Sequence, residues 1–228
     1  FKEAGELIVA FDEKELPRLL DLKKDAEKIG VPGLRIVDRD WLKINEPNLT
    51  DKVIAALYAP TAGILSPYRL VYDLYENALR NGVKAFCGRR VESIIGPRPD
   101  FEITTSQGVF RSDYVVNAAG LFADEISGMV GVDDFKITPR KGQEFILDKK
   151  KGHLTNHLIF PLPSRTTKGI LIIKTADGNP MIGPTAEDIQ DKEDLSTSQE
   201  GLKKALASAR RMIPSISEND IIAYFAGL

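Results

Sequence analysis

The residues whose type and spacing best suit ligand binding form a turn of small side chains, Asn117-Ala118-Ala119-Gly120. They directly follow the apolar run Tyr114-Val115-Val116, and a helical pattern from about Phe122 to Val130 comes next. Alanine and glycine let backbone N–H groups approach a ligand, and the N-terminus of a helix favours a phosphate. A strand, a turn of small residues and a helix are typical of a nucleotide-binding crossover. On these residues alone, simple packing of the helix on the strand accounts for the pattern equally well.

The glycine-rich dinucleotide signature G-x-G-x-x-G is absent from the sequence. In that signature the glycines allow a tight turn and a close approach of the backbone to a pyrophosphate. Judged by this motif alone, the sequence does not predict a dinucleotide site.

Other side chains that could do chemistry are few. Neither His153 nor His157 lies in a setting that marks it as a general base, and both are expected in turns or at the surface. The single cysteine, Cys87, ends an apolar stretch and is expected to be a buried structural thiol. One cysteine excludes an internal disulfide and a cysteine-based metal cluster, and no metal site is predicted. The catalytic residue is therefore not identified.

The charge balance limits the possible partners. The 228 residues carry a formal net charge of −2, which provides no general attraction for nucleic acid or for an anionic membrane. No apolar run reaches the roughly 18 residues that cross a bilayer, and no charged-then-apolar leader is present. We expect a small-molecule substrate, no nucleic-acid partner, no transmembrane segment and a cytoplasmic location.

Periodicity and turn signals predict a mixture of helices and strands. One helix is expected to begin at Ser66-Pro67 and to end at Asn81-Gly82, and another to follow a capping box at Thr197-Ser198-Gln199-Glu200. Further helices are predicted over residues 12–29, 39–45 and 122–130. Strands are predicted at residues 5–11, 34–37, 53–59, 83–86, 89–95, 101–105, 109–111, 114–116, 143–147, 157–160, 170–174, 180–182 and 221–225.

Several segments, taken in order, resemble one protein family. The stretch from Gly82-Val83-Lys84 through Val91-Glu92-Ser93-Ile94 to the turn at residues 114–124 is similar to the D-amino-acid oxidase superfamily of FAD proteins. Within it, the similarity is greatest to the branch of glycerol-3-phosphate dehydrogenase and L-2-hydroxyglutarate dehydrogenase. Pro139-Arg140-Lys141-Gly142-Gln143 resembles the strand that faces the flavin in that family. Residues 223–228 resemble the strand before its closing flavin loop, so the resemblance spans essentially the whole chain.

This resemblance implies a fold that is α/β and α+β: an incomplete FAD/NAD(P)-binding, Rossmann-like part and a mixed-sheet substrate domain. Residues 64–132 would be the middle part of the FAD-binding domain, and residues 1–63 and 133–228 would be two parts of the substrate domain. The family's glycine-rich unit would precede Phe1, and its flavin loop would follow Leu228. We therefore expect a fragment that is inactive alone, with an unpaired sheet edge that favours self-association.

The resemblance also implies FAD as the cofactor and the two-electron oxidation of glycerol 3-phosphate or a small 2-hydroxy acid. Hydride would pass to the flavin while a base takes the hydroxyl proton. By motif position, Val91 would lie at the adenine. Ala118, Ala119 and Gly120 in the small-residue turn would approach the cofactor closely. Gly183 and Gly227 would border the flavin, although tight turns explain these two glycines equally well.

An acidic or phosphorylated substrate needs charge-assisted hydrogen-bond donors. The candidates for contact with the substrate are Lys141, Gln143 and Lys174. Alternation along a strand puts Lys141 and Gln143 on one face, so both could point into one pocket, whereas Arg140 would point to the opposite face. The alternative is that these lysines face solvent at the ends of strands.

Two other functions stay open. The substrate part is compatible with amine or amino-acid oxidation in the same superfamily. In a different class, the chain would be a non-catalytic binding domain. Flavin absorbance separates these classes, because a complete flavoenzyme is yellow and a binding domain is colourless. The electron acceptor, whether a quinone, oxygen or a partner protein, is not predicted.

Overall fold

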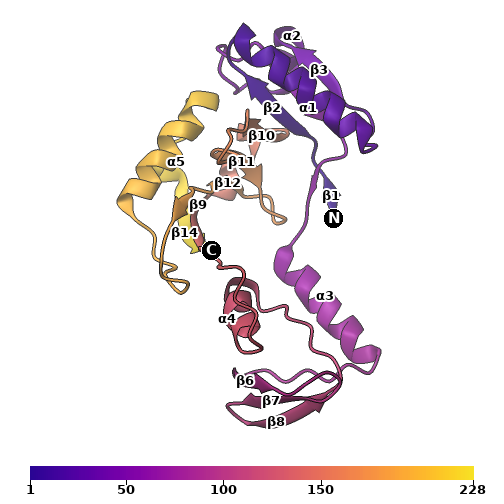
Figure 1. The fold of residues 1–228 in the computed structure, drawn as a ribbon. Helices are drawn as coiled ribbons and strands as arrows, with labels where there is room; N and C mark the ends of the chain where they lie inside the picture. Colours follow the sequence, from indigo (N-terminus) through magenta and orange to yellow (C-terminus); the bar gives the residue numbers. More distant parts are fainter. The chain divides into compact units, whose positions relative to one another are not determined.

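The computed structural model describes residues 1–228, and the contacts between them divide the chain into two compact units (Figure 1). The first unit consists of Phe1–Leu70, Lys141–Glu187 and Asp194–Gly227. The second consists of Val71–Arg140 and Asp188–Glu193, together with Leu228. The sequence analysis placed the two divisions after residues 63 and 132, whereas the contacts place them after residues 70 and 140 and also assign residues 188–193 to the second unit.

A mixed sheet of nine strands forms the centre of the first unit. Its order is β13-β9-β12-β11-β10-β2-β4-β3, and β14 also pairs with β9. β10 and β2 pair in parallel, whereas β9, β12 and β11 pair antiparallel. The fold is therefore mixed α/β, as the sequence predicts. The strands of this sheet are β2 (Glu6–Ala10), β3 (Arg35–Asp38), β4 (Ala55–Ala59), β9 (Arg140–Leu147), β10 (Leu158–Pro161), β11 (Leu171–Lys174), β12 (Pro180–Gly183), β13 (Glu187–Asp188) and β14 (Ile221–Gly227).

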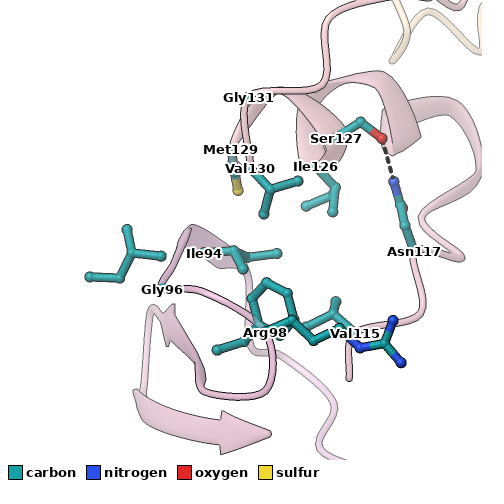
Figure 2. Close-up of a pocket in the computed structure, with 12 residues that line it drawn as sticks. Ile94, Gly96, Arg98, Val115, Asn117, Ile126, Ser127, Met129, Val130 and Gly131 are labelled. Carbon is teal, nitrogen blue, oxygen red and sulfur yellow. Dashed lines mark hydrogen bonds between the residues drawn. The ribbon is translucent and has the colours of Figure 1, made fainter. Parts of the chain in front are cut away.

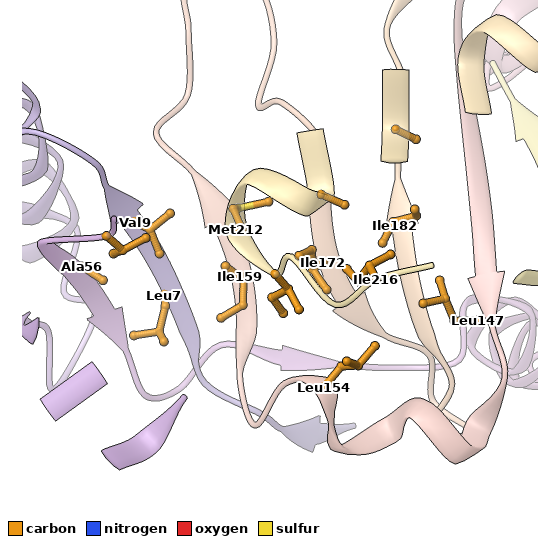
Figure 3. Close-up of a cluster of buried hydrophobic side chains, with 14 of the residues drawn as sticks. Leu7, Val9, Ala56, Leu147, Leu154, Ile159, Ile172, Ile182, Met212 and Ile216 are labelled. Atoms are coloured by element: carbon orange, nitrogen blue, oxygen red, sulfur yellow. The ribbon is translucent and has the colours of Figure 1, made fainter. Parts of the chain in front are cut away.

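Two helices cover opposite faces of this sheet. In β2, Leu7 and Val9 belong to a large buried cluster, which also contains Met212 of α5 (Gln199–Met212; Figure 3). The alternate residue Ala10 belongs to a smaller cluster with Leu19 of α1 (Leu16–Lys28). The remaining elements of this unit are β1 (Lys2–Glu3), η1 (Glu13–Glu15), α2 (Arg39–Asn45), β5 (Gly63–Ile64), η3 (Lys149–Leu154) and η4 (Glu218–Asp220).

Side-chain caps set the beginnings of α2 and α5. Asp38 accepts a hydrogen bond from the backbone N–H of Trp41 at 2.9 Å, so α2 begins where the sequence predicts. The predicted capping box before α5 is displaced by one residue. Ser198 is the N-cap instead of Thr197, and its hydroxyl accepts a hydrogen bond from the backbone N–H of Gly201 at 3.0 Å.

The second unit contains a three-stranded antiparallel sheet and a short helix (Figure 1). Helix α3 begins at Pro67, as predicted; it continues from the first unit into the second, and none of its residues is buried. No helix of the structure combines the length and the apolar character that crossing a bilayer requires. The elements are α3 (Pro67–Arg80), β6 (Val91–Ile95), β7 (Phe101–Thr105), β8 (Gly108–Ser112), η2 (Gly120–Phe122) and α4 (Ala123–Gly128).

Two predicted strands of the second unit are not strands in the structure. Residues 83–86 and 114–116 pair with no other segment, and their apolar side chains are exposed, to 53% at Val83 and 89% at Val116. A strand requires hydrogen bonds from a neighbour, which local sequence does not supply. The prediction that Cys87 is buried is wrong for the same reason, because no sheet covers the segment that leads to it and the thiol is exposed.

Truncation at the centre of the large core should destabilise the chain strongly. Ile172 of β11 is fully buried in the same cluster as Met212. We expect Ile172→Ala to lower the free energy of unfolding by about 2–5 kcal/mol, through lost burial and the cavity left behind. Urea unfolding measures this difference. Ile44→Ala is the matched control, because Ile44 is 80% exposed and its truncation should change stability by no more than about 0.5 kcal/mol. Equal losses in both variants would contradict the placement of this core.

Candidate functional site

Asn117 organises the small-residue turn of the second unit. Its side-chain amide donates a hydrogen bond to the carbonyl of Ala123 at 2.7 Å. It donates a second one to the hydroxyl of Ser127 at 3.1 Å (Figure 2). Its carbonyl oxygen accepts from the backbone N–H of Ala119 at 3.3 Å. These bonds tie the turn to the beginning and the end of α4, so that its backbone conformation is fixed before any ligand binds.

The three residues after Asn117 leave one side of the backbone uncovered. Ala118, Ala119 and Gly120 are exposed. Gly120 adopts a φ of +57°, and a Cβ built there would meet no atom within 4 Å. The glycine is therefore favoured by its left-handed backbone, and no side chain of the unit occupies the space in front of it. An exposed turn of this kind fits a group that must approach the main chain closely, as a dinucleotide cofactor does.

A partly buried ion pair holds α4 next to this turn. Lys192 donates hydrogen bonds to Asp124 at 2.6 Å and to Glu125 at 3.0 Å. Asp124 also accepts from the backbone N–H of Ile137 at 3.0 Å. The ammonium of Lys192, and secondarily the Ile137 N–H, lower the pKa of Asp124 to about 2. The segment that carries Lys192 thus belongs to the second unit through this carboxylate.

The second unit also contains a cavity of about 760 Å³ between its sheet and α4 (Figure 2). Most of its lining is apolar, with Asn117, Ser127 and Arg98 as the polar exceptions. None of the predicted cofactor residues lines it. Val91 lies at the start of β6, half-buried and opposite Thr105 of β7. Of the small-residue turn only Asn117 reaches the lining, and residues 118–120 lie outside it.

The other two predicted cofactor residues lie in the first unit. Gly183 has a φ of +140°, and an added Cβ would come within 2.8 Å of the carbonyl oxygen of Gln143. Close packing of β12 on β9 is therefore enough to require glycine at this position. Gly227 is exposed at the end of β14, opposite Gly142, and a Cβ there would meet nothing within 4 Å. The structure brings the predicted cofactor residues into two sets, one in each unit.

Lys141 and Gln143 line one cavity of about 410 Å³ in the first unit, beside the N-terminus of α5. Both side chains are almost fully buried, so neither faces solvent. Lys141 donates to Asp194 at 2.7 Å and lowers the pKa of that carboxyl well below its usual range. The carbonyl oxygen of the Gln143 side chain accepts from the backbone N–H of Ser198 at 2.7 Å. Gly201 packs directly against this amide, since a Cβ there would lie 2.3 Å from its oxygen.

Lys174 lies away from this cavity, on β11, two strands from β9. Its side chain is half-buried, and the loss of hydration lowers the pKa of its ammonium. The structure therefore brings together two of the three predicted substrate residues and separates the third.

A buried carboxylate and histidine were missed by sequence reasoning. Glu46 is 1% exposed, and one of its oxygens accepts from the backbone N–H of Asn156 and contacts Nδ1 of His157, both at 2.8 Å. His157 lies in the bend before β10, so the expectation of a turn residue holds, but its side chain is not at the open surface, because this contact and the rings of Trp41 and Tyr58 cover it. His153 is exposed, as predicted. No local pattern in the sequence links the two residues, because they lie more than a hundred positions apart.

Comparison with known proteins gives one consistent result. The family of FAD-dependent oxidoreductases named DAO matches residues 1–228. Glycerol 3-phosphate dehydrogenase of Caloramator mitchellensis is 40% identical over 228 residues, which are 100% of this chain and 48% of that protein. L-2-hydroxyglutarate dehydrogenase of Indibacter alkaliphilus is 28% identical, over 95% of this chain and 53% of that protein. The chain thus spans about half the length of these curated relatives.

The solved structures agree with the sequence comparisons. L-α-glycerophosphate oxidase of Mycoplasma pneumoniae, reduced and with FAD bound, superposes with a TM-score of 0.91 at 26% identity. The match covers 99% of this chain and 61% of that one. L-proline dehydrogenase of P. horikoshii superposes with a TM-score of 0.87 at 24% identity, which establishes a shared fold.

Removal of the partly buried carboxylate of Asp124 should make the stability of the chain less dependent on pH. The folded pKa of Asp124 is lowered, so its stabilising contribution is complete above the ordinary aspartate pKa of about 4 and is lost as the pH falls through about 2. We expect Asp124→Asn to lower the urea midpoint near neutral pH, and the difference from wild type to disappear in strong acid. Asp73→Asn, on the exposed helix α3, is the control and should leave the midpoint unchanged at every pH. A loss that does not vary with pH would contradict the ion pair.

Proposed function

Since the chain belongs to the DAO family of FAD-dependent oxidoreductases, we propose that it is part of a dehydrogenase that oxidises glycerol 3-phosphate or a small 2-hydroxy acid. The observation that carries this proposal is the 40% identity, along the whole chain, with glycerol 3-phosphate dehydrogenase of C. mitchellensis. Two glycerol 3-phosphate oxidases and several L-2-hydroxyglutarate dehydrogenases among the relatives support the same substrate classes.

FAD, when bound, supplies the two-electron chemistry of this reaction. Residues 64–132 would contribute the middle part of the domain that binds it, and residues 1–63 and 133–228 the substrate domain. Ala118, Ala119 and Gly120 would present backbone N–H groups to the cofactor, because Asn117 and α4 already hold the turn in place. Val91 would contact the adenine through its backbone, and Gly183 and Gly227 would border the flavin.

Lys141 and Gln143 would act on the substrate indirectly. Both have their hydrogen-bonding groups engaged inside the first unit, Lys141 with Asp194 and Gln143 with Ser198. A substrate anion would have to compete with the carboxylate of Asp194 for Lys141. We therefore assign to both residues the positioning of β9 against α5. Lys174 has no carboxylate hydrogen-bonded to it, but alternation along β11 places it on the same face as the buried Ile172, so its contact with an anionic group stays a prediction. The electron acceptor is unassigned, and self-association and a cytoplasmic location stay predictions.

Flavin reduction by substrate tests the function directly. In the full-length FAD-loaded protein under anaerobic conditions, we expect glycerol 3-phosphate or 2-hydroxyglutarate to bleach the oxidised flavin absorbance. Glycine and proline serve as the comparison, since bleaching by these alone would favour the amine-oxidising alternative. A full-length protein that binds no flavin would remove the enzyme proposal and favour a binding domain.

Substitution in the small-residue turn tests the cofactor assignment. Gly120→Val adds a branched side chain in front of the exposed backbone and disfavours the left-handed φ, so we expect the affinity of the full-length apoprotein for FAD to fall at least about tenfold. Titration with FAD measures the dissociation constant. Gly88→Val is the matched control, because Gly88 has a φ of +70° and equally open space in the same unit. Equal losses of affinity in both variants would mean that strain in the fold, and not contact with the cofactor, causes the effect.

A further inference from the structure

One face of the sheet in the first unit carries an acidic side chain among apolar ones. In β9, Gln143, Phe145 and Leu147 are buried toward α5, so alternation places Glu144 on the opposite face. Phe225 of β14 lies beside Glu144 on one side, and Gly183 of β12 lies on the other.

The apolar surroundings continue across this face. Leu171 of β11 pairs with Gly183, so the next side chain in the row of Glu144 is aliphatic. The neighbouring row contains Ile146 of β9, Met181 of β12 and Ile173 of β11, joined by the same ladders. Among the six residues of these two rows on β9, β12 and β11, only Glu144 has an ionisable side chain.

The carboxyl group of Glu144 lacks a partner in the chain. Its Oε2 atom is buried without a hydrogen bond, and no ion pair reaches the side chain. Burial raises the pKa of this carboxyl above its usual value. A half-buried carboxyl with an unsatisfied oxygen costs folding free energy, so a group of this kind at a sheet face is a candidate for ligand contact. Gly183 lets Glu144 pack against the backbone of β12, because a Cβ at position 183 would lie 3.4 Å from Cγ of Glu144.

We propose that Glu144 is a specificity-determining residue whose carboxylate accepts a hydrogen bond from a second hydroxyl group of the substrate. This assignment rests on the proposed function and narrows its substrate class to a polyol phosphate. A carboxylate offers acceptors only, so its natural partner is a donor such as a hydroxyl. Glycerol 3-phosphate carries a terminal hydroxyl on the carbon next to the reacting one. 2-Hydroxyglutarate carries a carboxylate there, which Glu144 would repel.

The geometry on this face suits such a contact. The torsion that ends a glutamate side chain is broad and nearly two-fold, so either oxygen can turn toward a ligand on the same face. The apolar neighbours Ile146, Met181 and Phe225 would contact the carbon chain of the ligand and exclude water from the hydrogen bond. A hydrogen bond to a carboxylate in such surroundings is stronger than one at a wet surface.

The test compares two ligands that differ in one hydroxyl. Glycerol 3-phosphate and 2-hydroxypropyl phosphate share the phosphate and the reacting hydroxyl, and only the first has the terminal hydroxyl. Calorimetric titration of the full-length FAD-loaded protein, with its flavin reduced beforehand and kept anaerobic so that neither ligand can be oxidised, measures both dissociation constants. In wild type we expect glycerol 3-phosphate to bind at least about tenfold more tightly, as a hydrogen bond to a charged group provides.

Substitutions at position 144 should remove this preference. In Glu144→Leu the two ligands should bind equally, and in Glu144→Gln the preference should be reduced but present. The preference of wild type should also decrease as the pH falls through the pKa of Glu144, because the protonated carboxyl is a poorer acceptor, whereas that of Glu144→Gln should not vary. Glu27→Gln is the control, with the same chemical change on the exposed surface of α1, and should keep the wild-type ratio.

The outcomes separate this assignment from the proposed function. Equal binding of the two ligands to wild type, or an unchanged ratio in Glu144→Leu, would overturn the role of Glu144. If Glu144→Leu does not fold, the pH dependence of wild type against Glu144→Gln decides. If wild type binds glycerol 3-phosphate more tightly than 2-hydroxypropyl phosphate but glycerol 3-phosphate does not reduce the flavin, the proposed oxidation is wrong. Glu144 then remains a contact for a polyol phosphate. Binding of neither ligand would overturn both.

Discussion

The hydrogen bonds around Gln143 fix the register of β9, and the arrangement of the first unit depends on that register. The backbone N–H of Gln143 donates to the hydroxyl of Thr185 at 3.0 Å, and its side-chain oxygen accepts from the N–H of Ser198 at 2.7 Å. These bonds tie one strand to the segment after β12 and to the beginning of α5. A slip of one residue would exchange the two faces of β9. Phe145 would leave the core, and Glu144 would enter it beneath α5.

Local signals in the sequence were sufficient for elements whose ends are set by their own residues. Asp38 caps α2, and Pro67 begins α3, at the predicted positions. Strands were predicted correctly where a neighbour in the chain supplies the partner, as β7 and β8 do for each other. Residues 83–86 and 114–116 have the apolar composition of strands but no partner in the described chain. Composition indicates that a segment can pair, and only the rest of the sheet decides whether it does.

The candidate site likewise has parts that depend on neighbouring residues in the sequence and parts that depend on distant segments. The turn at residues 117–120 could be recognised because its small residues and the helix after it are adjacent in sequence. The residues that hold it could not, since Lys192 reaches Asp124 from a distant segment. The contact of Glu46 with His157 spans a longer interval, of 111 residues. Lys141 and Gln143 were correctly placed on one face by the two-residue period of a strand, but the period does not specify which face, and here it is the one that α5 covers.

The packing of Gly201 against Gln143 links two positions that are far apart in the chain. Because a Cβ at 201 would lie 2.3 Å from the oxygen of the Gln143 side chain, α5 approaches β9 only as closely as the smallest residue allows. A larger residue at 201 requires the side chain at 143 to turn aside, with loss of its hydrogen bond to Ser198, or to become shorter. In a set of related sequences the two positions would then vary together, and the size of one would limit the choice at the other.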